Sequence, residues 1–171
     1  LCAAGLTAWN AVVETGALRA GERVLVLGTG GVATLALQIA RLHGARVAVT
    51  SSSDAKLEAA RALGADITVN YQRHPDWARA YLQASGGVGA DLVVETGGQA
   101  TLAESIAAAA PNARIALIGA LGGAAPVALA NFSSIVGKNL DLRGITVGSR
   151  AMLQRLLRAA EQGGLRPVID H

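Results

Sequence analysis

Short runs of valine, isoleucine and leucine recur along the chain, separated by longer segments of helical character. The clearest run is 23–27, and similar runs lie at 45–49, 66–69, 91–95, 114–118 and 140–147. Continuous apolar runs of this length are typical of parallel strands, which are buried on both faces and therefore lack the alternation of half-exposed strands. The pattern predicts a parallel sheet of about six strands.

Helical patterns fill the segments between these runs. Residues 32–42 are apolar on most faces, as in a helix packed against a sheet, whereas 54–63 is amphipathic and follows serines that can cap its first turn. Further helices are predicted at 1–14, at 76–83 after Pro75, at 101–110 where Thr101 and Glu104 match a capping box, and at 150–162 before two glycines. The alternation predicts an α/β fold with a doubly wound parallel sheet and helices on both faces.

Composition supports a folded core made of small side chains. Hydrophobic residues make up 51% of the 171 residues, charged residues 16% and aromatic residues only 3%. No repeat or low-complexity linker interrupts the pattern, so we expect one domain over 1–171. The chain starts with a helix before its first strand and stops at an apolar pair, 168–169, with no closing strand. We therefore expect it to be a piece of a longer, two-domain protein.

Charge and cysteine content narrow the class of partner. The net charge is +3 and the basic residues are scattered, which argues against a nucleic-acid partner. The apolar run 115–130 is uncharged but contains three glycines and Pro126, so we expect no membrane span. A single cysteine, Cys2, forms no internal disulfide, and the amino-terminal residues lack the basic region of a signal peptide. These features favour a cytoplasmic protein.

The strongest chemical signal is the glycine-rich turn 28–33, Gly-Thr-Gly-Gly-Val-Ala, which follows the first strand and opens a helix. Gly28 can make the tight turn, Gly30 lets a ligand approach the backbone, and Ala33 allows close packing of helix on strand. The free amides of the helix start, at Gly31 and Val32, would face the pyrophosphate of a dinucleotide. The spacing predicts a Rossmann fold that binds NAD or NADP, and it lacks the Gly-Lys-Ser/Thr of a P-loop.

The tip of the second predicted strand bears on the choice between the two cofactors. An NAD site usually places an acid there, about twenty residues after the first glycine. Here the tip carries four small hydroxyl residues, Thr50, Ser51, Ser52 and Ser53, and Lys56 follows them. Hydroxyl groups and a cation suit a 2′-phosphate, so NADP is favoured while NAD stays possible. In the alternative, the serines only cap a helix, Lys56 is a solvated surface residue and Asp54 reaches the ribose.

With these motifs the sequence resembles the medium-chain dehydrogenase/reductase superfamily, in its zinc-type alcohol dehydrogenase and quinone oxidoreductase branches. The resemblance covers nearly the whole chain. It rests on the segments 5–9 (Gly-Leu-Thr-Ala-Trp), 28–33, 63–66 (Leu-Gly-Ala-Asp) with 70–71 (Asn-Tyr), 91–98, 138–140 (Lys-Asn-Leu) and 148–150 (Gly-Ser-Arg).

The resemblance implies further cofactor contacts. Lys56 and Tyr71 match a lysine and tyrosine that flank the adenosine phosphate in the NADPH-dependent quinone oxidoreductases. A second set falls where the family lines the nicotinamide half of the groove: Gly119, Ala120, Leu121, Gly148 and Ser149. Without the family likeness, Tyr71 reads as a partly buried aromatic at a strand end, and Arg150 as the first residue of the last helix.

The resemblance also implies an oxidoreductase whose catalytic half lies outside this chain. The complete enzyme would transfer a hydride between the nicotinamide and an alcohol, carbonyl, quinone or enone, while this domain alone would not turn over substrate. Aligned on Gly5, Ala3 occupies the place of a zinc-ligand cysteine, so we expect no zinc here and interpret Cys2 as a buried small residue. His43, His74 and His171 have no ligand spacing and are predicted at the surface.

Other functions were weighed against this one. A nucleotide-sensing binding module without catalysis can use the same fold. An S-adenosylmethionine-dependent methyltransferase also begins with a glycine-rich strand–turn–helix, but the serine tip disfavours it. The 140–147 strand is predicted to be an edge that pairs across a homodimer, as is common in the superfamily, or one that Asp141 and Arg143 protect from pairing.

Overall fold

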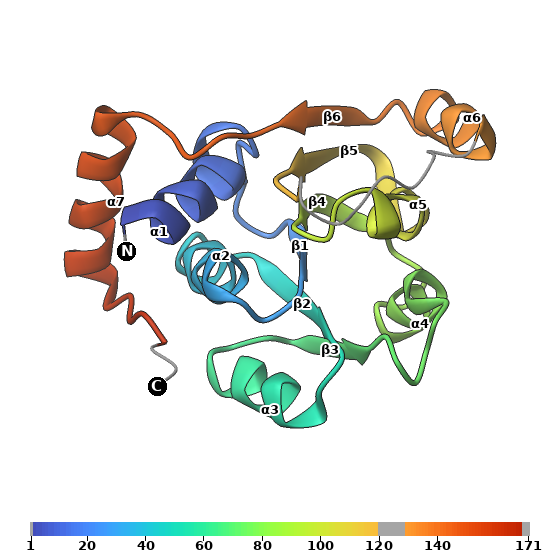
Figure 1. Ribbon diagram of the computed structural model, residues 1–171, viewed down its shortest axis with the longest axis horizontal. Coiled ribbons are helices and arrows are strands. Elements are labelled where there is room, and N and C mark those ends of the chain that lie inside the picture. The colour runs from blue at the N-terminus through green and yellow to red at the C-terminus, as the bar shows by residue number, and fades with distance from the viewer. Residues whose placement is uncertain (1, 120–128, 169–171) are drawn as a thin grey trace.

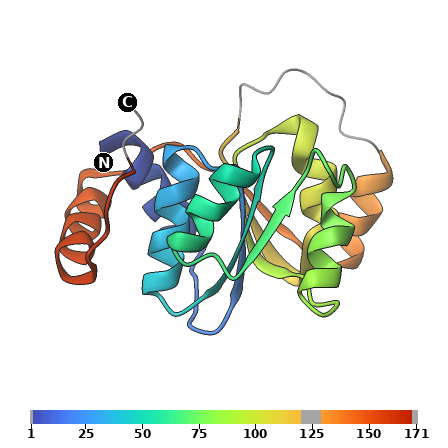
Figure 2. The same cartoon turned by 90° about the horizontal axis from the view of Figure 1, so that it is seen from below.

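The computed structural model describes residues 2–119 and 129–168 of the chain, which form a parallel sheet between two layers of helices (Figures 1 and 2). The sheet has six strands in the order β3-β2-β1-β4-β5-β6, and every neighbouring pair is parallel. Their bounds are β1 Arg23–Leu27, β2 Arg46–Ser51, β3 Ile67–Asn70, β4 Ala90–Glu95, β5 Ala109–Leu117 and β6 Asp141–Gly144. The predicted doubly wound Rossmann fold is confirmed.

Helices cover the two faces in separate groups. One face carries α1 (Cys2–Trp9) with its π-helical continuation Asn10–Glu14, α2 (Gly31–Leu42), α3 (Asp54–Ala62) and α7 (Arg150–Gly163). The other carries α4 (Trp77–Ala84), α5 (Gln99–Ala108) and α6 (Leu129–Gly137). In the described ranges, no helix combines the length and apolar character that crossing a membrane requires.

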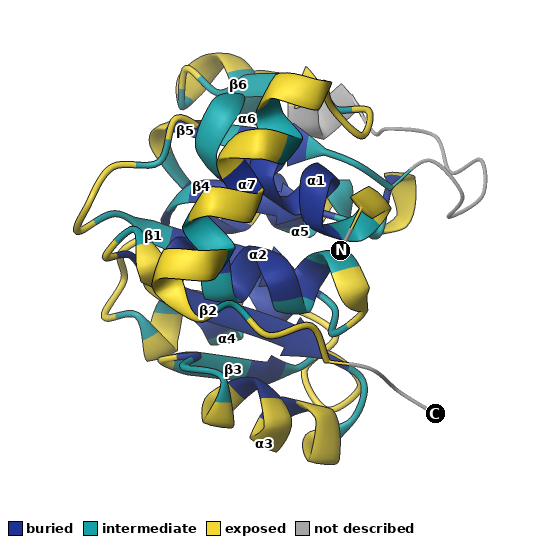
Figure 3. Cartoon of the chain, turned by 90° about the vertical axis from the view of Figure 1, so that its left-hand side faces the viewer, coloured by how far each residue is buried: buried dark blue, intermediate teal, exposed yellow. Residues whose placement is uncertain are grey.

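Alternate residues of each strand supply the two cores. In β1, Val24 and Val26 pack toward α2, whereas Leu25 and Leu27 pack toward α4 and α5. Helix α2 is buried on most sides because it lies between the sheet and α1, and Figure 3 shows it in the dark-blue interior while α3 and α7 present exposed outer faces. Its many alanines allow this close packing, as the apolar pattern of 32–42 predicts.

One helix was not predicted. The segment α6 was overlooked because its outward positions carry apolar side chains, so it lacks the polar face that marks an amphipathic helix. Phe132 is 68% exposed and Val136 64% exposed, whereas Ile135 packs against the core.

The predicted capping box was wrong because the helix begins before Thr101 and because Glu104 bonds to another helix. Helix α5 begins at Gln99, and the Thr101 hydroxyl donates to Glu95 Oε1 and the Gly98 carbonyl. Glu104 Oε2 accepts from the Ala78 amide at the start of α4 instead of returning to its own helix. Strand bounds also differ, since β5 begins at residue 109 and β6 ends at 144.

Candidate functional site

The predicted glycine turn lies where the direction of winding of the sheet reverses. Strand β1 pairs with β2 on one side and with β4 on the other. All three strands are parallel, so the segments that follow Leu27, Ser51 and Glu95 meet at the carboxyl edge of the sheet. The crevice at such a reversal is the usual ligand site of open α/β sheets.

The glycine turn is fixed to both neighbouring strands. Gly28 has a φ of 78°, a left-handed conformation that favours glycine, and its amide donates to the Thr50 hydroxyl at 3.4 Å. On the other side, the Thr96 hydroxyl donates to the Leu27 carbonyl at 2.7 Å. The Thr29 hydroxyl lies 3.3 Å from the Ser51 hydroxyl. These bonds define the position of the backbone before any ligand is present.

The start of α2 is open toward the crevice. Gly30 is the N-cap residue, and no side chain caps the helix there, so its first amides are available to a ligand. A Cβ placed on Gly30 would meet nothing within 4 Å, and one on Gly31 would make only an ordinary contact with Ala4 at 3.5 Å. Packing therefore does not require glycine at position 30, whereas close approach of a phosphate does.

The two residues behind this opening pack inward. Val32 is half-buried against the core, and Ala33 is 3% exposed, as expected of the position where the helix closes on the strand. The amide of Val32 still belongs to the uncapped first turn. The turn thus has one side that is open to a ligand and one side that packs against the core.

The hydroxyl residues at the tip of β2 are partly engaged within the protein. Thr50 and Ser51 are buried, and their hydroxyls face Gly28 and Thr29. Ser53 is the N-cap of α3 and accepts a bond from the Lys56 amide at 3.4 Å, as the capping alternative expects. Ser52 is half-exposed. Within this group, the side chains of Ser52 and Lys56 form no hydrogen bond or ion pair with the described residues.

A hollow of about 520 Å³ joins the glycine turn to α3. Thr29, Gly30 and Gly31 form one side, and Lys56 lies on the other with a run of α3 residues. Lys56 is exposed, and its ammonium group has no partner in the described part of the chain. The structure therefore brings Lys56 to the same hollow as the glycine turn.

Tyr71 does not line that hollow. It follows β3, its side chain is 41% exposed, and its amide donates to the Ser51 carbonyl at 3.1 Å. The ring is thus exposed rather than partly buried, and its predicted place beside the adenosine phosphate stays a prediction.

Asp54, the acid that could serve a ribose, is held by other side chains. Its Oδ1 accepts from Asn70 Nδ2 at 2.7 Å, and its Oδ2 forms an ion pair with Arg73. The carboxylate therefore bridges α3 to the segment after β3.

The opposite wall of the crevice is organised by Glu95, whose role the sequence analysis missed. This residue ends β4, is 0% exposed, and its carboxylate accepts four hydrogen bonds. The donors are the amides of Gly97 at 2.7 Å and Gly98 at 3.0 Å, and the hydroxyls of Thr101 at 2.6 Å and Ser105. The signal was available as an acid at the end of a buried apolar strand, followed by a Thr-Gly-Gly turn.

The same wall includes Gly119, a predicted contact of the nicotinamide half. The amides of Ile118 and Gly119 donate to the Glu95 carbonyl. A Cβ on Gly119 would lie 2.4 Å from the Thr96 carbonyl oxygen and 2.5 Å from the Gly98 nitrogen, so only glycine fits. Ala120 and Leu121 lie outside the described residues.

Gly148 and Ser149 have local structural roles. Gly148 has a φ of 141° and packs against Leu6 and Met152. The Ser149 hydroxyl accepts from the Met152 amide at 3.3 Å and caps α7, and Arg150 is the first residue of that helix. These contacts account for both residues, and their predicted contact with the nicotinamide stays a prediction.

The interpretation of Cys2 as a buried residue was wrong, because its side chain is exposed at the start of α1. His43 is half-buried rather than superficial, with Nδ1 2.8 Å from the Ile39 carbonyl and its ring edge-on to Trp9. His74 is exposed, and His171 lies outside the described residues. Among the residues that the structure covers, no three histidine, cysteine or acidic side chains gather as metal ligands would.

Comparisons with known proteins agree with this geometry. The model of the zinc-binding dehydrogenase family matches residues 31–162. A zinc-type alcohol dehydrogenase-like protein of Schizosaccharomyces pombe is 44% identical over 99% of the chain, which covers 50% of that relative. The chain thus spans about half the length of the curated relatives it matches.

Solved structures show the same fold over about half of longer chains. An NAD-dependent alcohol dehydrogenase superposes with a TM-score of 0.89 and 40% identity over 98% of this chain and 48% of that one. A quinone oxidoreductase of Pseudomonas syringae pv. tomato superposes with a TM-score of 0.83 and 30% identity over 95% of this chain and 52% of that one. The chain belongs to the zinc-binding dehydrogenase family, among the zinc-type alcohol dehydrogenase and quinone oxidoreductase branches of the medium-chain dehydrogenases/reductases, and corresponds to their NAD(P)-binding domain.

Proposed function

We propose that this chain is the cofactor domain of a two-domain, NADP(H)-dependent oxidoreductase. The complete enzyme would transfer a hydride between the nicotinamide and an alcohol, carbonyl, quinone or enone. The bound cofactor would supply the hydride chemistry, and this domain would bind and orient it. The catalytic residues would come from the part of the enzyme outside this chain, and nothing in the described residues is assigned to catalysis.

The observation that carries the NADP preference is the position of Lys56 on the hollow beside Gly30 and Gly31. Its ammonium group has no partner among the described residues, and the acids of the same helix are engaged elsewhere, Asp54 with Asn70 and Arg73 and Glu58 with Arg61. A 2′-phosphate would place two negative charges near this free cation, whereas the diol of NAD would offer it only hydroxyl groups. One similar structure is that of an NAD-dependent enzyme, so the choice depends on this chain's own residues.

The residues around the turn fit a dinucleotide. The uncapped start of α2 offers backbone amides to a pyrophosphate, and Gly30 leaves open space above them. On the far side, the Glu95 network fixes Gly98 and Gly119, which would form the floor of the nicotinamide half. Backbone surfaces without side chains suit a flat ring that must lie close to the protein.

Replacing Lys56 by alanine tests the cofactor preference. We expect about a tenfold or greater loss of affinity for NADPH and little change for NADH, since a charge-assisted bond contributes roughly 1.5–3 kcal/mol. Calorimetric titration of both cofactors into the complete protein measures the two affinities. Equal losses for the two cofactors would reject a phosphate contact.

Arg61→Ala is the matched control. Arg61 is also on α3, is exposed, and pairs with Glu58 rather than facing the hollow. The substitution removes one positive charge from the same helix, as Lys56→Ala does. A similar loss of NADPH affinity in this variant would therefore show a general electrostatic effect and not a local contact.

Dimerisation through the edge strand is proposed separately. Strand β6 pairs only with β5, so its outer edge has no strand partner among the described residues. Light scattering of the complete protein tests whether a second copy covers it. A cytoplasmic location, with neither nucleic acid nor membrane as partner, stays part of this proposal.

A further inference from the structure

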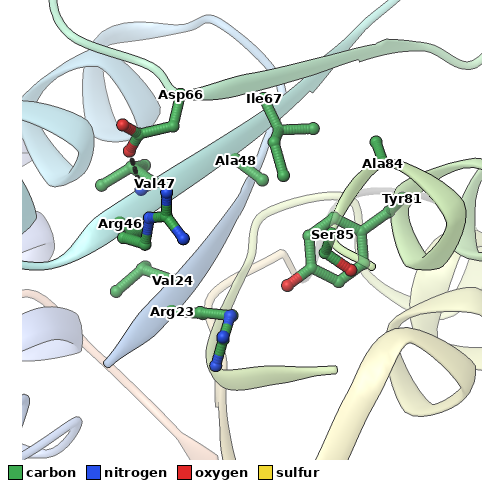
Figure 4. A pocket seen from close by; sticks show the side chains of 10 residues that line it. All are labelled: Arg23, Val24, Arg46, Val47, Ala48, Asp66, Ile67, Tyr81, Ala84 and Ser85. Atoms are coloured by element: carbon green, nitrogen blue, oxygen red, sulfur yellow. Dashed lines mark hydrogen bonds between the residues drawn. The ribbon is translucent and has the colours of Figure 1, made fainter. Parts of the chain in front are cut away.

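A second hollow lies at the amino-terminal edge of the sheet, opposite to the cofactor crevice (Figure 4). Its volume is about 250 Å³, and it opens between the first residues of β1 and β2 and the carboxyl end of α4. The polar groups on its walls are the side chains of Arg23, Arg46, Asp66, Tyr81 and Ser85. None of them takes part in the proposed cofactor binding.

Two arginines stand side by side at this edge. Arg23 and Arg46 are partners in the register of β1 and β2, and both line the hollow. No hydrogen bond or ion pair holds either guanidinium group among the described residues. Like charges on paired positions of neighbouring strands are destabilising. An anion between the two groups would remove that repulsion.

The neighbouring acids are committed to other donors. Asp66 accepts from the Val47 amide at 2.7 Å and pairs with Arg41 at 3.1 Å. Asp91 accepts from the backbone amide of Arg23 at 2.8 Å. The Ser85 hydroxyl donates within its own turn, to the Val88 carbonyl at 2.7 Å. No described residue therefore supplies an acceptor to the two guanidinium groups.

Tyr81 adds an unsatisfied donor at the inner end of the hollow. Its side chain is 1% exposed, and its hydroxyl lies beside the Ser85 hydroxyl without a hydrogen bond of regular geometry to any described residue. Figure 4 shows the ring extending from α4 with the hydroxyl toward β1, on the side of Arg23. Burial raises the pKa of Tyr81 to about 12, so the group is a neutral donor at physiological pH. A buried donor without an acceptor is costly, and a ligand oxygen would satisfy it.

The remaining walls are apolar. Ala48, Ile67 and Ala84 lie on the walls of the hollow, whereas Val24 and Val47 border it with their side chains packed toward α2 on the other face of the sheet. A planar carboxylate matches the fork of a guanidinium group, and a short aliphatic chain matches these walls, whereas inorganic phosphate would leave the walls uncovered. We propose that this hollow binds a short-chain carboxylate, with its anionic group between Arg23 and Arg46 and within reach of the Tyr81 hydroxyl.

Butanoate is the probe, titrated into the complete protein and monitored by calorimetry and by carbon-13 shifts of the ligand. A ligand of so few atoms is expected to bind at about millimolar concentrations. Arg23→Gln and Tyr81→Phe should each weaken butanoate about tenfold or more, and inorganic phosphate should bind less tightly than butanoate. NADPH affinity should be unchanged in both variants, which separates this site from the cofactor crevice.

Two controls keep the test decisive. Arg158→Gln removes the same charge from the exposed face of α7 and should leave butanoate binding unchanged. Tyr81→Phe without ligand should melt at the same temperature or higher, because it removes an unsatisfied buried hydroxyl. A folded wild-type protein that binds no butanoate would overturn the proposal. So would equal binding by the wild type and both site variants, or phosphate binding as tight as butanoate.

Discussion

The two walls of the proposed cofactor crevice are both rich in glycine, but their glycines serve different purposes. On the β1 wall, Gly30 borders open space, and a side chain there would touch nothing within 4 Å. On the β4 wall, Gly98 and Gly119 approach each other so closely that a Cβ on either would collide with backbone atoms. The first wall leaves room for a ligand, whereas the second is closed by the protein itself.

The polar groups of the two walls differ in the same way. The first amides of α2 have no side-chain cap, whereas the Glu95 carboxylate satisfies two amides and two hydroxyls in the interior. Glycine content alone therefore does not identify a binding surface. Space and unsatisfied donors identify it, and a rigid neighbouring wall keeps it in shape.

The largest effect is expected from Glu95→Ala. It would leave the amides of Gly97 and Gly98 buried without an acceptor and cost about 3–5 kcal/mol of the free energy of unfolding. Urea denaturation measures the loss. Glu95→Gln is the control, since the amide keeps one acceptor oxygen and can donate to the Ser105 hydroxyl. If both variants lost the same stability, charge rather than hydrogen bonding would explain the residue.

Gly119→Ala is expected to have the next largest effect. The new methyl group would lie within 2.5 Å of two backbone atoms, which cannot move without disturbing the Thr96–Gly98 turn. We expect a loss of about 1–3 kcal/mol in the same assay. A variant as stable as the wild type would show that the β4 wall is more adaptable than its contacts indicate.

Gly30→Ala should separate stability from binding. Its backbone, with φ at −76°, suits alanine, so replacing this N-cap should cost under about 1 kcal/mol. Cofactor affinity should fall about tenfold or more, because the methyl group would occupy the approach of the pyrophosphate. Gly137→Ala, which also borders open space but lies on α6, should leave cofactor affinity unchanged. Unchanged affinity in Gly30→Ala would contradict the role of the open wall.

The smallest effect concerns Glu14, a partly exposed acid that contrasts with Glu95. Burial alone would raise its pKa, but hydrogen bonds from Trp9 and Arg155 outweigh burial and lower the pKa below the ordinary value. A lowered folded-state pKa contributes stability above the unfolded value, about 4.3, and that stability is lost as the pH falls through the folded value.

The Glu14→Gln variant tests this contribution. It should be under about 1 kcal/mol less stable at neutral pH and equal to the wild type in acid. Thermal unfolding between neutral and acidic pH measures the difference. A gap that persists at low pH would show that packing, not charge, accounts for the residue.

Local patterns predicted most of the fold and one wall of the site. The six strands and the turn at 28–33 were found because a buried strand, a glycine turn and a helix follow one another directly in the sequence. Lys56 was found because it lies one turn into the helix after β2. These signals depend on neighbours along the chain.

The other wall depends on the Glu95 network and on the approach of Gly119 to the Thr96–Gly98 turn, and this second contact joins residues far apart in the sequence. Thr101 and Glu104 match a capping box, yet one bonds to Glu95 and the other to the start of α4. Helix α6 was missed because its exposed side carries Phe132 and Val136. The pairing of Arg23 with Arg46 follows from strand register and is equally invisible in the sequence.

Titration of NADPH and NADH into the complete protein determines whether the crevice binds a dinucleotide and which cofactor it prefers. The open turn at Gly30 and the free cation of Lys56 predict that both cofactors bind at one site and that NADPH binds more tightly. A well-folded protein that binds neither cofactor would contradict the assignment of this crevice as a dinucleotide site.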